Sequence, residues 1–169
     1  MERVRPWLAG PTGTMFAILM LLVVGFSIMA PAAFPTVVNL RGILTDAAIL
    51  LVLAIGATFV IVTAGIDLSV GAVLVFSSVI GAKAMDALGN AGFGPILVGL
   101  LVATASGTAW GIANGVLVAK AKLPPFVATL GTLGAAYGLS LVISGGLDVR
   151  SVPDELVSFG NERILGIPN

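Results

Sequence analysis

The chain has 169 residues, of which 58% are hydrophobic and only 9% are charged, with a mean hydropathy of +1.14. Soluble domains carry about 25% charged residues, so this chain has too few charged side chains to cover a water-exposed surface. The eight basic and eight acidic residues cancel, and a nucleic-acid partner, which needs a basic stripe, is not expected. The composition therefore predicts a protein embedded in a lipid bilayer.

Two residue types are missing altogether, since the chain has no cysteine and no histidine. This composition excludes disulfides, cysteine nucleophiles and thiolate metal sites, and it removes the commonest general base and metal ligand. No phosphate-binding loop with the P-loop spacing occurs either. We therefore expect no enzymatic activity, no cofactor and no metal in this chain.

The length leaves room for about five membrane spans of roughly 20 residues each. The fold class predicted is an all-α, polytopic transmembrane helix bundle. A cytoplasmic N-terminus over residues 1–13 precedes the transmembrane domain 14–146, and a polar periplasmic loop over 147–169 follows it. The expected spans cover residues 14–30, 46–64, 68–86, 96–119 and 125–143.

The first apolar run, residues 14–30, follows a short segment that contains Arg3 and Arg5. A secretory signal peptide has the same order of basic and apolar parts, but this run is longer than a signal core and further spans follow it. We expect an uncleaved first helix. Pro31 and Pro35 then favour a loop over residues 31–39.

The second and third spans are joined by residues 63–71, TAGIDLSVG. Asp67 and Ser69 both suit a helix start, where side-chain oxygens accept orphan backbone N–H groups. An ionisable group at membrane depth is also a functional candidate by default, for instance in a proton relay. The capping role and the functional role of Asp67 both stay open at this point.

The fourth span carries small residues at every fourth position, from Gly99 and Ala103 to Gly107, Gly111 and Gly115. Steps of four keep these residues close to one helix face. Such a face lets another helix approach closely in lipid, and it could alternatively slide during transport. We expect leucine at positions 107 or 111 to disturb the bundle more than leucine in the turn at position 89.

Asn114 lies on the same span, where a buried amide needs hydrogen-bond partners. It predicts either an interhelical hydrogen bond or a position lining a substrate pathway.

The fifth span is expected to stop at Ser144, Gly145 and Gly146, and the tail holds at most a short helix near residues 154–160. Basic residues favour a cytoplasmic N-terminus.

Three stretches carry a family resemblance: residues 63–71, residues 111–118 (GIANGVLV) and residues 123–132 (LPPFVATLGT). In order and spacing they resemble the inner-membrane permeases of bacterial monosaccharide ABC importers of the ribose, xylose and arabinose type. The resemblance implies a pore-forming subunit that pairs as a dimer, binds separate ABC ATPase subunits and receives sugar from a periplasmic sugar-binding protein. Candidate pathway or helix-packing residues are Asp67, Ser69, Gly107, Gly111, Asn114, Gly115, Thr129 and Thr132.

Members of that family are about twice as long, so the resemblance implies an N-terminal half that is truncated in the periplasmic loop. Within the class, a permease for branched-chain amino acids or another small solute is the alternative. Outside it, the alternatives are an ion-coupled secondary transporter and a membrane fragment that does not transport.

Overall fold

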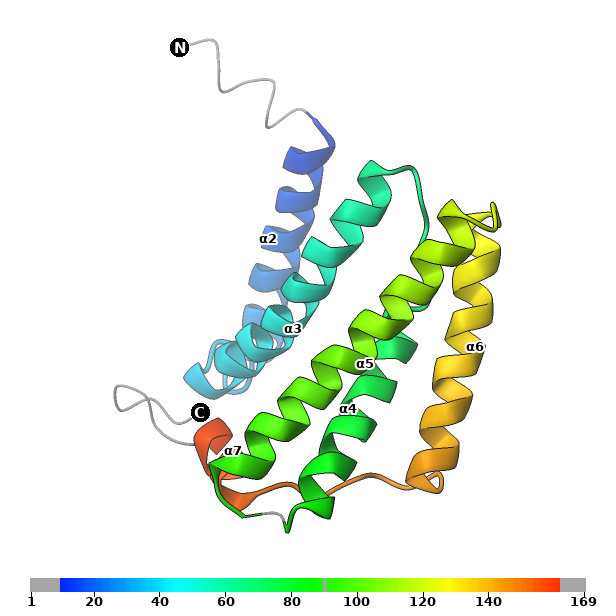
Figure 1. The fold of residues 1–169 in the computed structure, drawn as a ribbon. Helices are drawn as coiled ribbons and strands as arrows, with labels where there is room; N and C mark the ends of the chain where they lie inside the picture. The colour runs from blue at the N-terminus through cyan, green and yellow to red at the C-terminus, as the bar shows by residue number, and fades with distance from the viewer. Residues whose placement is uncertain (1–9, 90, 162–169) are drawn as a thin grey trace. The chain divides into compact units, whose positions relative to one another are not determined.

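The computed structural model describes residues 10–89 and 91–161, and in these residues every regular element is a helix. Five of the helices are long and apolar enough to cross a membrane, which confirms the predicted all-α bundle of five spans. A sixth, short helix lies in the polar tail (Figure 1). The helices are α2 (Pro11–Met29), α3 (Val37–Val62), α4 (Val70–Ala87), α5 (Phe93–Ala119), α6 (Pro125–Ser144) and α7 (Asp154–Asn161).

The second span differs most from the sequence expectation, because α3 starts at Val37 and not at residue 46. The cause is a cap: the Oγ1 atom of Thr36 accepts a hydrogen bond from the Asn39 N–H group at 3.2 Å, which is the bond that starts a helix. The Asn39 side chain donates to the Phe34 carbonyl at 2.8 Å. Residues 37–39, expected in a loop, are therefore helical.

The end of α3 is a Schellman motif, in which the Gly65 N–H group bonds to the Val60 carbonyl and the Ala64 N–H group to the Ile61 carbonyl. The residue in the left-handed conformation is Ala64, with φ of 57°. Glycine usually takes this position because it has no Cβ atom. At the end of α6, Gly145 takes it with φ of 68°, and the helix ends at Ser144, where the sequence predicts its stop.

The chain divides into two compact units, Met1–Leu51 and Val52–Asn169. In the first unit, the rings of Phe26 and Phe34 pack with their centroids 5.5 Å apart at the end of α2. In the second unit, α4 contacts both α5 and α6, and α5 also contacts α6. Figure 1 shows α4 beside α5 in this three-helix group. Every candidate site residue lies in this group or in the α3–α4 connection directly before it.

Glycines bring α4 and α5 into close backbone contact. A Cβ atom built on Gly81 would lie 2.9 Å from the carbonyl oxygen of Gly99, and one built on Gly99 would collide with the side chain of Met85. Only residues without a Cβ atom permit this backbone contact. The predicted small-residue face of the fourth span therefore packs against α4 at its first members.

The polar tail contains α7 where the sequence predicts a short helix, near residues 154–160. Pro153 is fully buried, and the Glu155 carboxylate of α7 accepts a hydrogen bond from the Gly92 N–H group at 2.9 Å. Gly92 is the N-cap residue of α5. An acid at this end of a helix complements the positive end of its dipole, so α7 holds the start of α5.

Candidate functional site

The connection between α3 and α4 is not a surface loop, because it reaches into the three-helix group. Ser69, directly before α4, contacts Asn114, which lies five residues before α5 ends at Ala119. At 1.5 Å per residue this is about 8 Å inside that end of the helix. Irregular backbone at such depth is found in membrane proteins where it is buried in protein or lines a cavity.

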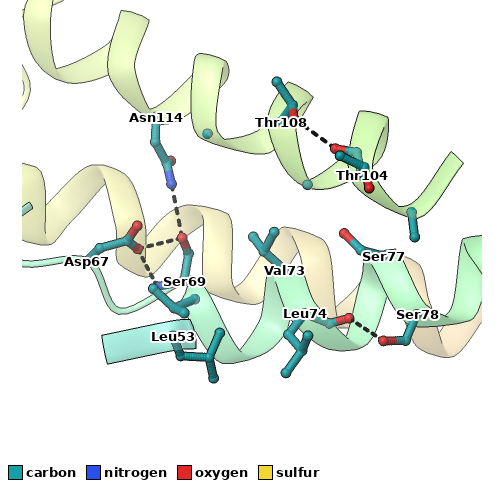
Figure 2. A pocket seen from close by; sticks show the side chains of 14 residues that line it. Leu53, Asp67, Ser69, Val73, Leu74, Ser77, Ser78, Thr104, Thr108 and Asn114 are labelled. Carbon is teal, nitrogen blue, oxygen red and sulfur yellow. Dashed lines mark hydrogen bonds between the residues drawn. The ribbon is translucent and has the colours of Figure 1, made fainter. Parts of the chain in front are cut away.

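Four polar side chains form one continuous hydrogen-bonded chain at this depth. The Thr132 hydroxyl donates to Asn114 Oδ1 at 2.5 Å, and the Asn114 amide donates to the Ser69 hydroxyl at 3.0 Å. The Ser69 hydroxyl donates in turn to Asp67 Oδ1 at 2.6 Å (Figure 2). The chain ties the α3–α4 connection to α5 and to α6. We call these four residues the polar chain.

The polar chain is largely withdrawn from solvent. Ser69 is 1% exposed, Asn114 8% and Thr132 5%, while Asp67 is half-buried. Because each buried polar group has a partner, the network avoids the penalty of an unsatisfied group, about 1–3 kcal/mol each. Networks of this kind impose one arrangement on the helices that share them.

A second contact fixes the same connection to α6. The hydroxyl oxygen of Thr129 accepts a hydrogen bond from the Leu68 N–H group at 3.2 Å. Its own proton has a partner in the Pro125 carbonyl, 2.9 Å away. Thr129 is 4% exposed, so it satisfies a backbone group that would otherwise be buried alone.

Asp67 does not cap α4 in the predicted way. The N-cap residue is Ser69, whose side chain makes no capping bond to the helix. Asp67 Oδ1 instead accepts the N–H group of Ser69 itself at 2.8 Å. The expectation that the side-chain oxygens of Asp67 and Ser69 bind the first-turn amides is therefore wrong, because Asp67 Oδ1 and the Ser69 hydroxyl bond within the polar chain and the N-cap has no side-chain bond.

Two grooves, each of about 460 Å³, meet at the polar chain. One groove runs along α4 and α5, and the other lies between the end of α3, α5 and the start of α6. Asp67, Gly111 and Asn114 border both. No hydrogen bond from the described residues reaches Asp67 Oδ2, so this carboxylate oxygen can accept one from a solute or from water.

The small residues of α5 separate into two groups along the helix. Gly99 packs closely on α4, and a Cβ atom on Gly107 would lie 3.3 Å from the hydroxyl oxygen of Ser77. A Cβ atom on Gly111 or Gly115 would meet nothing within 4 Å. Gly111 faces the grooves, so the structure gives no tight contact at its Cβ position, and the expected effect of leucine there stays a prediction.

The turn residue expected to tolerate leucine is also a poor control. Gly89 has φ of 95°, a conformation that side chains with a Cβ atom rarely adopt. Substitution there strains the backbone even though the space around it is open.

Sequence reasoning missed Ser77 and Gly81. Gly81 is the partner of Gly99 on α4, and the stripe on the fourth span implied that such a partner exists without identifying it. Ser77 lies in the α4–α5 groove next to Gly107. Nothing in the sequence distinguishes it from its neighbour Ser78, because helical phase alone does not say which serine faces another helix.

The fold defines a multi-pass helical membrane protein whose core is interrupted by a buried polar connection. Residues 39–164 match the family model described as "Branched-chain amino acid transport system / permease component". The chain belongs to this family of transport permeases, which confirms the resemblance to bacterial ABC importer permeases.

Two curated relatives illustrate the match. The D-allose transport system permease protein AlsC of Escherichia coli is 37% identical over 156 residues, which cover 92% of this chain and 46% of the relative. The autoinducer 2 import system permease protein LsrC of Yersinia pseudotuberculosis is 40% identical over 125 residues, covering 74% of this chain and 34% of the relative. The chain thus spans between about a third and about half of these proteins. No solved structure matches it.

Proposed function

We propose that this chain forms part of the translocation pathway of a bacterial ABC importer and that its cargo is a monosaccharide. The observation that carries the proposal is the unengaged Asp67 Oδ2 at the junction of two grooves, which offers an acceptor to a hydroxyl-rich, uncharged solute. The relative named for D-allose transport supports a sugar as cargo. The residues that line the pathway or pack the helices around it are 67, 69, 107, 111, 114, 115, 129 and 132.

Membership in this family of permeases also implies which other subunits the chain works with. The chain contains no P-loop, so ATP is hydrolysed on separate ATPase subunits. A periplasmic binding protein delivers the sugar, and a second permease subunit completes the pore. The protein lies in the inner membrane with a cytoplasmic N-terminus, an orientation favoured by its basic residues.

Uptake of labelled D-allose and labelled leucine by the reconstituted transporter tests the cargo. We expect ATP-dependent uptake of D-allose, and about a threefold to tenfold rise in KM for Asp67→Asn, because the amide loses the charge that strengthens a hydrogen bond. Thr58→Val, at an exposed position of α3 that borders neither groove and with its hydroxyl bound to the Ala54 carbonyl, is the control and should transport normally.

Three results would contradict the proposal. Leucine uptake without D-allose uptake would favour a branched-chain amino acid permease, which the printed description of the family keeps as the second candidate. Uptake that is abolished by a proton or sodium ionophore but insensitive to ATP removal would favour an ion-coupled secondary transporter. Absence of any uptake would favour a fragment that does not transport.

A further inference from the structure

Ser77 has a hydroxyl group without a partner among the described residues. The residue is 9% exposed, and its hydroxyl oxygen is buried. The neighbouring hydroxyls are all satisfied within their own helices: Ser78 donates to the Leu74 carbonyl at 2.9 Å, and Thr108 to the Thr104 carbonyl at 2.8 Å. A buried unsatisfied hydroxyl in a folded protein calls for a specific explanation.

The position of this hydroxyl points to the groove between α4 and α5. Figure 2 shows the Ser77 side chain directed from α4 toward α5. The residue it meets there is Gly107, where a Cβ atom would lie only 3.3 Å from the hydroxyl oxygen. Glycine therefore leaves the hydroxyl uncrowded, and the space widens toward Gly111, which has nothing near it.

The distance from the polar chain gives Ser77 a separate place in the groove. Ser77 lies eight residues after Ser69, about 12 Å farther along the helix axis. A monosaccharide bound to Asp67 does not reach that far. The groove thus offers two acceptor or donor positions in succession, and multiple weak positions are what passage through a pore requires.

We propose that the Ser77 hydroxyl is a second contact for the transported sugar, reached when α5 moves away from α4 at the level of Gly107. This proposal rests on the proposed function. The backbone contact between Gly81 and Gly99 lies beyond this level and serves as the point about which the helices separate. In the closed arrangement described here the hydroxyl is covered, and in the open arrangement a sugar hydroxyl completes its hydrogen bonding.

Thiol labelling tests the exposure of this position, because the chain has no cysteine of its own. The variants Ser77→Cys and Ser144→Cys are made in the assembled transporter and treated with a small, water-soluble thiol reagent. We expect slow labelling of Ser77→Cys at rest, at least severalfold faster labelling during ATP turnover, and protection by saturating D-allose. Labelling of Ser144→Cys, at the end of α6 and outside both grooves, should be insensitive to D-allose.

Transport kinetics test the contact itself. Ser77→Ala should raise KM for D-allose about threefold to tenfold, the effect of one lost hydrogen bond, while Ser144→Ala, outside both grooves, should leave KM unchanged. Gly107→Ala crowds the hydroxyl without removing it and should raise KM in the same direction. This second variant keeps the test decisive if Ser77→Ala assembles poorly.

The outcomes separate the two proposals. A wild type that transports leucine but no D-allose overturns the proposed cargo and the sugar contact with it. A wild type that transports D-allose, with normal kinetics in both Ser77→Ala and Gly107→Ala, overturns only the Ser77 contact. Labelling during turnover without protection by D-allose would show a hydroxyl that meets water, which also overturns it.

Discussion

At the scale of single residues, the polar chain is the feature that joins three helices. Asn114 is its centre, because its amide donates to Ser69 while its carbonyl oxygen accepts from Thr132. Interhelical hydrogen bonds in membrane proteins contribute about 0.6–2 kcal/mol each. Asn114 therefore fixes how α5 sits against the α3–α4 connection and α6.

We expect Asn114→Ala to destabilise the three-helix group by about 1–2 kcal/mol, because two hydrogen bonds are lost and their partners are left buried. Reversible unfolding in mixed detergent measures the change. The effect should not add to that of Ser69→Ala, and the coupling should be about 0.5–1 kcal/mol since both changes break the same bond. Strict additivity of the two variants would contradict a shared network.

At Ala64, in contrast, we expect a substitution to stabilise the chain. The φ of 57° at this residue costs a residue with a Cβ atom about 1 kcal/mol. We expect Ala64→Gly to stabilise the chain by about 0.5–1 kcal/mol, while Ala57→Gly, within α3, should destabilise it by a similar amount. Thermal unfolding of the two variants gives the comparison, and a destabilised Ala64→Gly protein would argue against the Schellman end.

The sequence identifies all four members of the polar chain but not its connections. Asp67 and Ser69 suit a helix start, Asn114 is a buried amide that needs partners, and Thr132 lies in one of the three stretches that carry the family resemblance. Which partner each one has depends on the depth of the α3–α4 connection, and no local pattern encodes that depth. Ser77 could not be identified from the sequence, because what distinguishes it is a buried hydroxyl with no partner among the described residues, which only the three-dimensional structure shows.

At the scale of helices, the crossing of α4 and α5 is set by Gly81 and Gly99. The stripe on α5 predicted a packing face, and the structure shows that the face packs only at its first members. The remaining glycines, Gly111 and Gly115, open onto the grooves. A repeat in sequence indicates which residues share a face, but the partner helix decides how far along that face contact extends.

Alanine scanning of the glycines tests this division. Gly81→Ala should destabilise the protein by about 1–3 kcal/mol, because the added methyl group meets the Gly99 backbone and cannot be accommodated by side-chain rotation. Gly134→Ala, in α6 with nothing within 4 Å, should be neutral or slightly stabilising. Equal losses for both variants would remove the α4–α5 crossing as a specific contact.

The start of α3 shows why helix bounds were harder to predict than helix number. Five apolar runs of sufficient length are visible in composition alone. The start at Val37 depends on the Thr36 cap and the Asn39 side chain, whereas the prolines just before it favoured a longer loop. Arg41 and Asp46 also lie inside this helix, although charged residues usually suggest the end of a span.

At the scale of the whole molecule, the described helices place the α3–α4 and α5–α6 connections at one end of the three-helix group and the α4–α5 connection at the other. The proposed orientation makes the first end cytoplasmic. Lys120 and Lys122 then lie on the cytoplasmic side.

Single cysteines introduced into the cysteine-free chain test this orientation. A membrane-impermeant thiol reagent added outside spheroplasts should label Gly146→Cys, after α6, and should not label Ala121→Cys, between α5 and α6. Permeabilised membranes should label both, which serves as the control. The reverse pattern would place the N-terminus outside.

The shortness of α4 has a consequence for permeation. Its 18 residues extend about 27 Å, whereas the 27 residues of α5 extend about 40 Å. The hydrocarbon layer is about 30 Å thick. Because α4 begins deeper than the end of α5, polar backbone and hydroxyl groups there shorten the apolar path across the membrane. A dissolved sugar would shed its hydration shell over a shorter distance here than across undisturbed lipid.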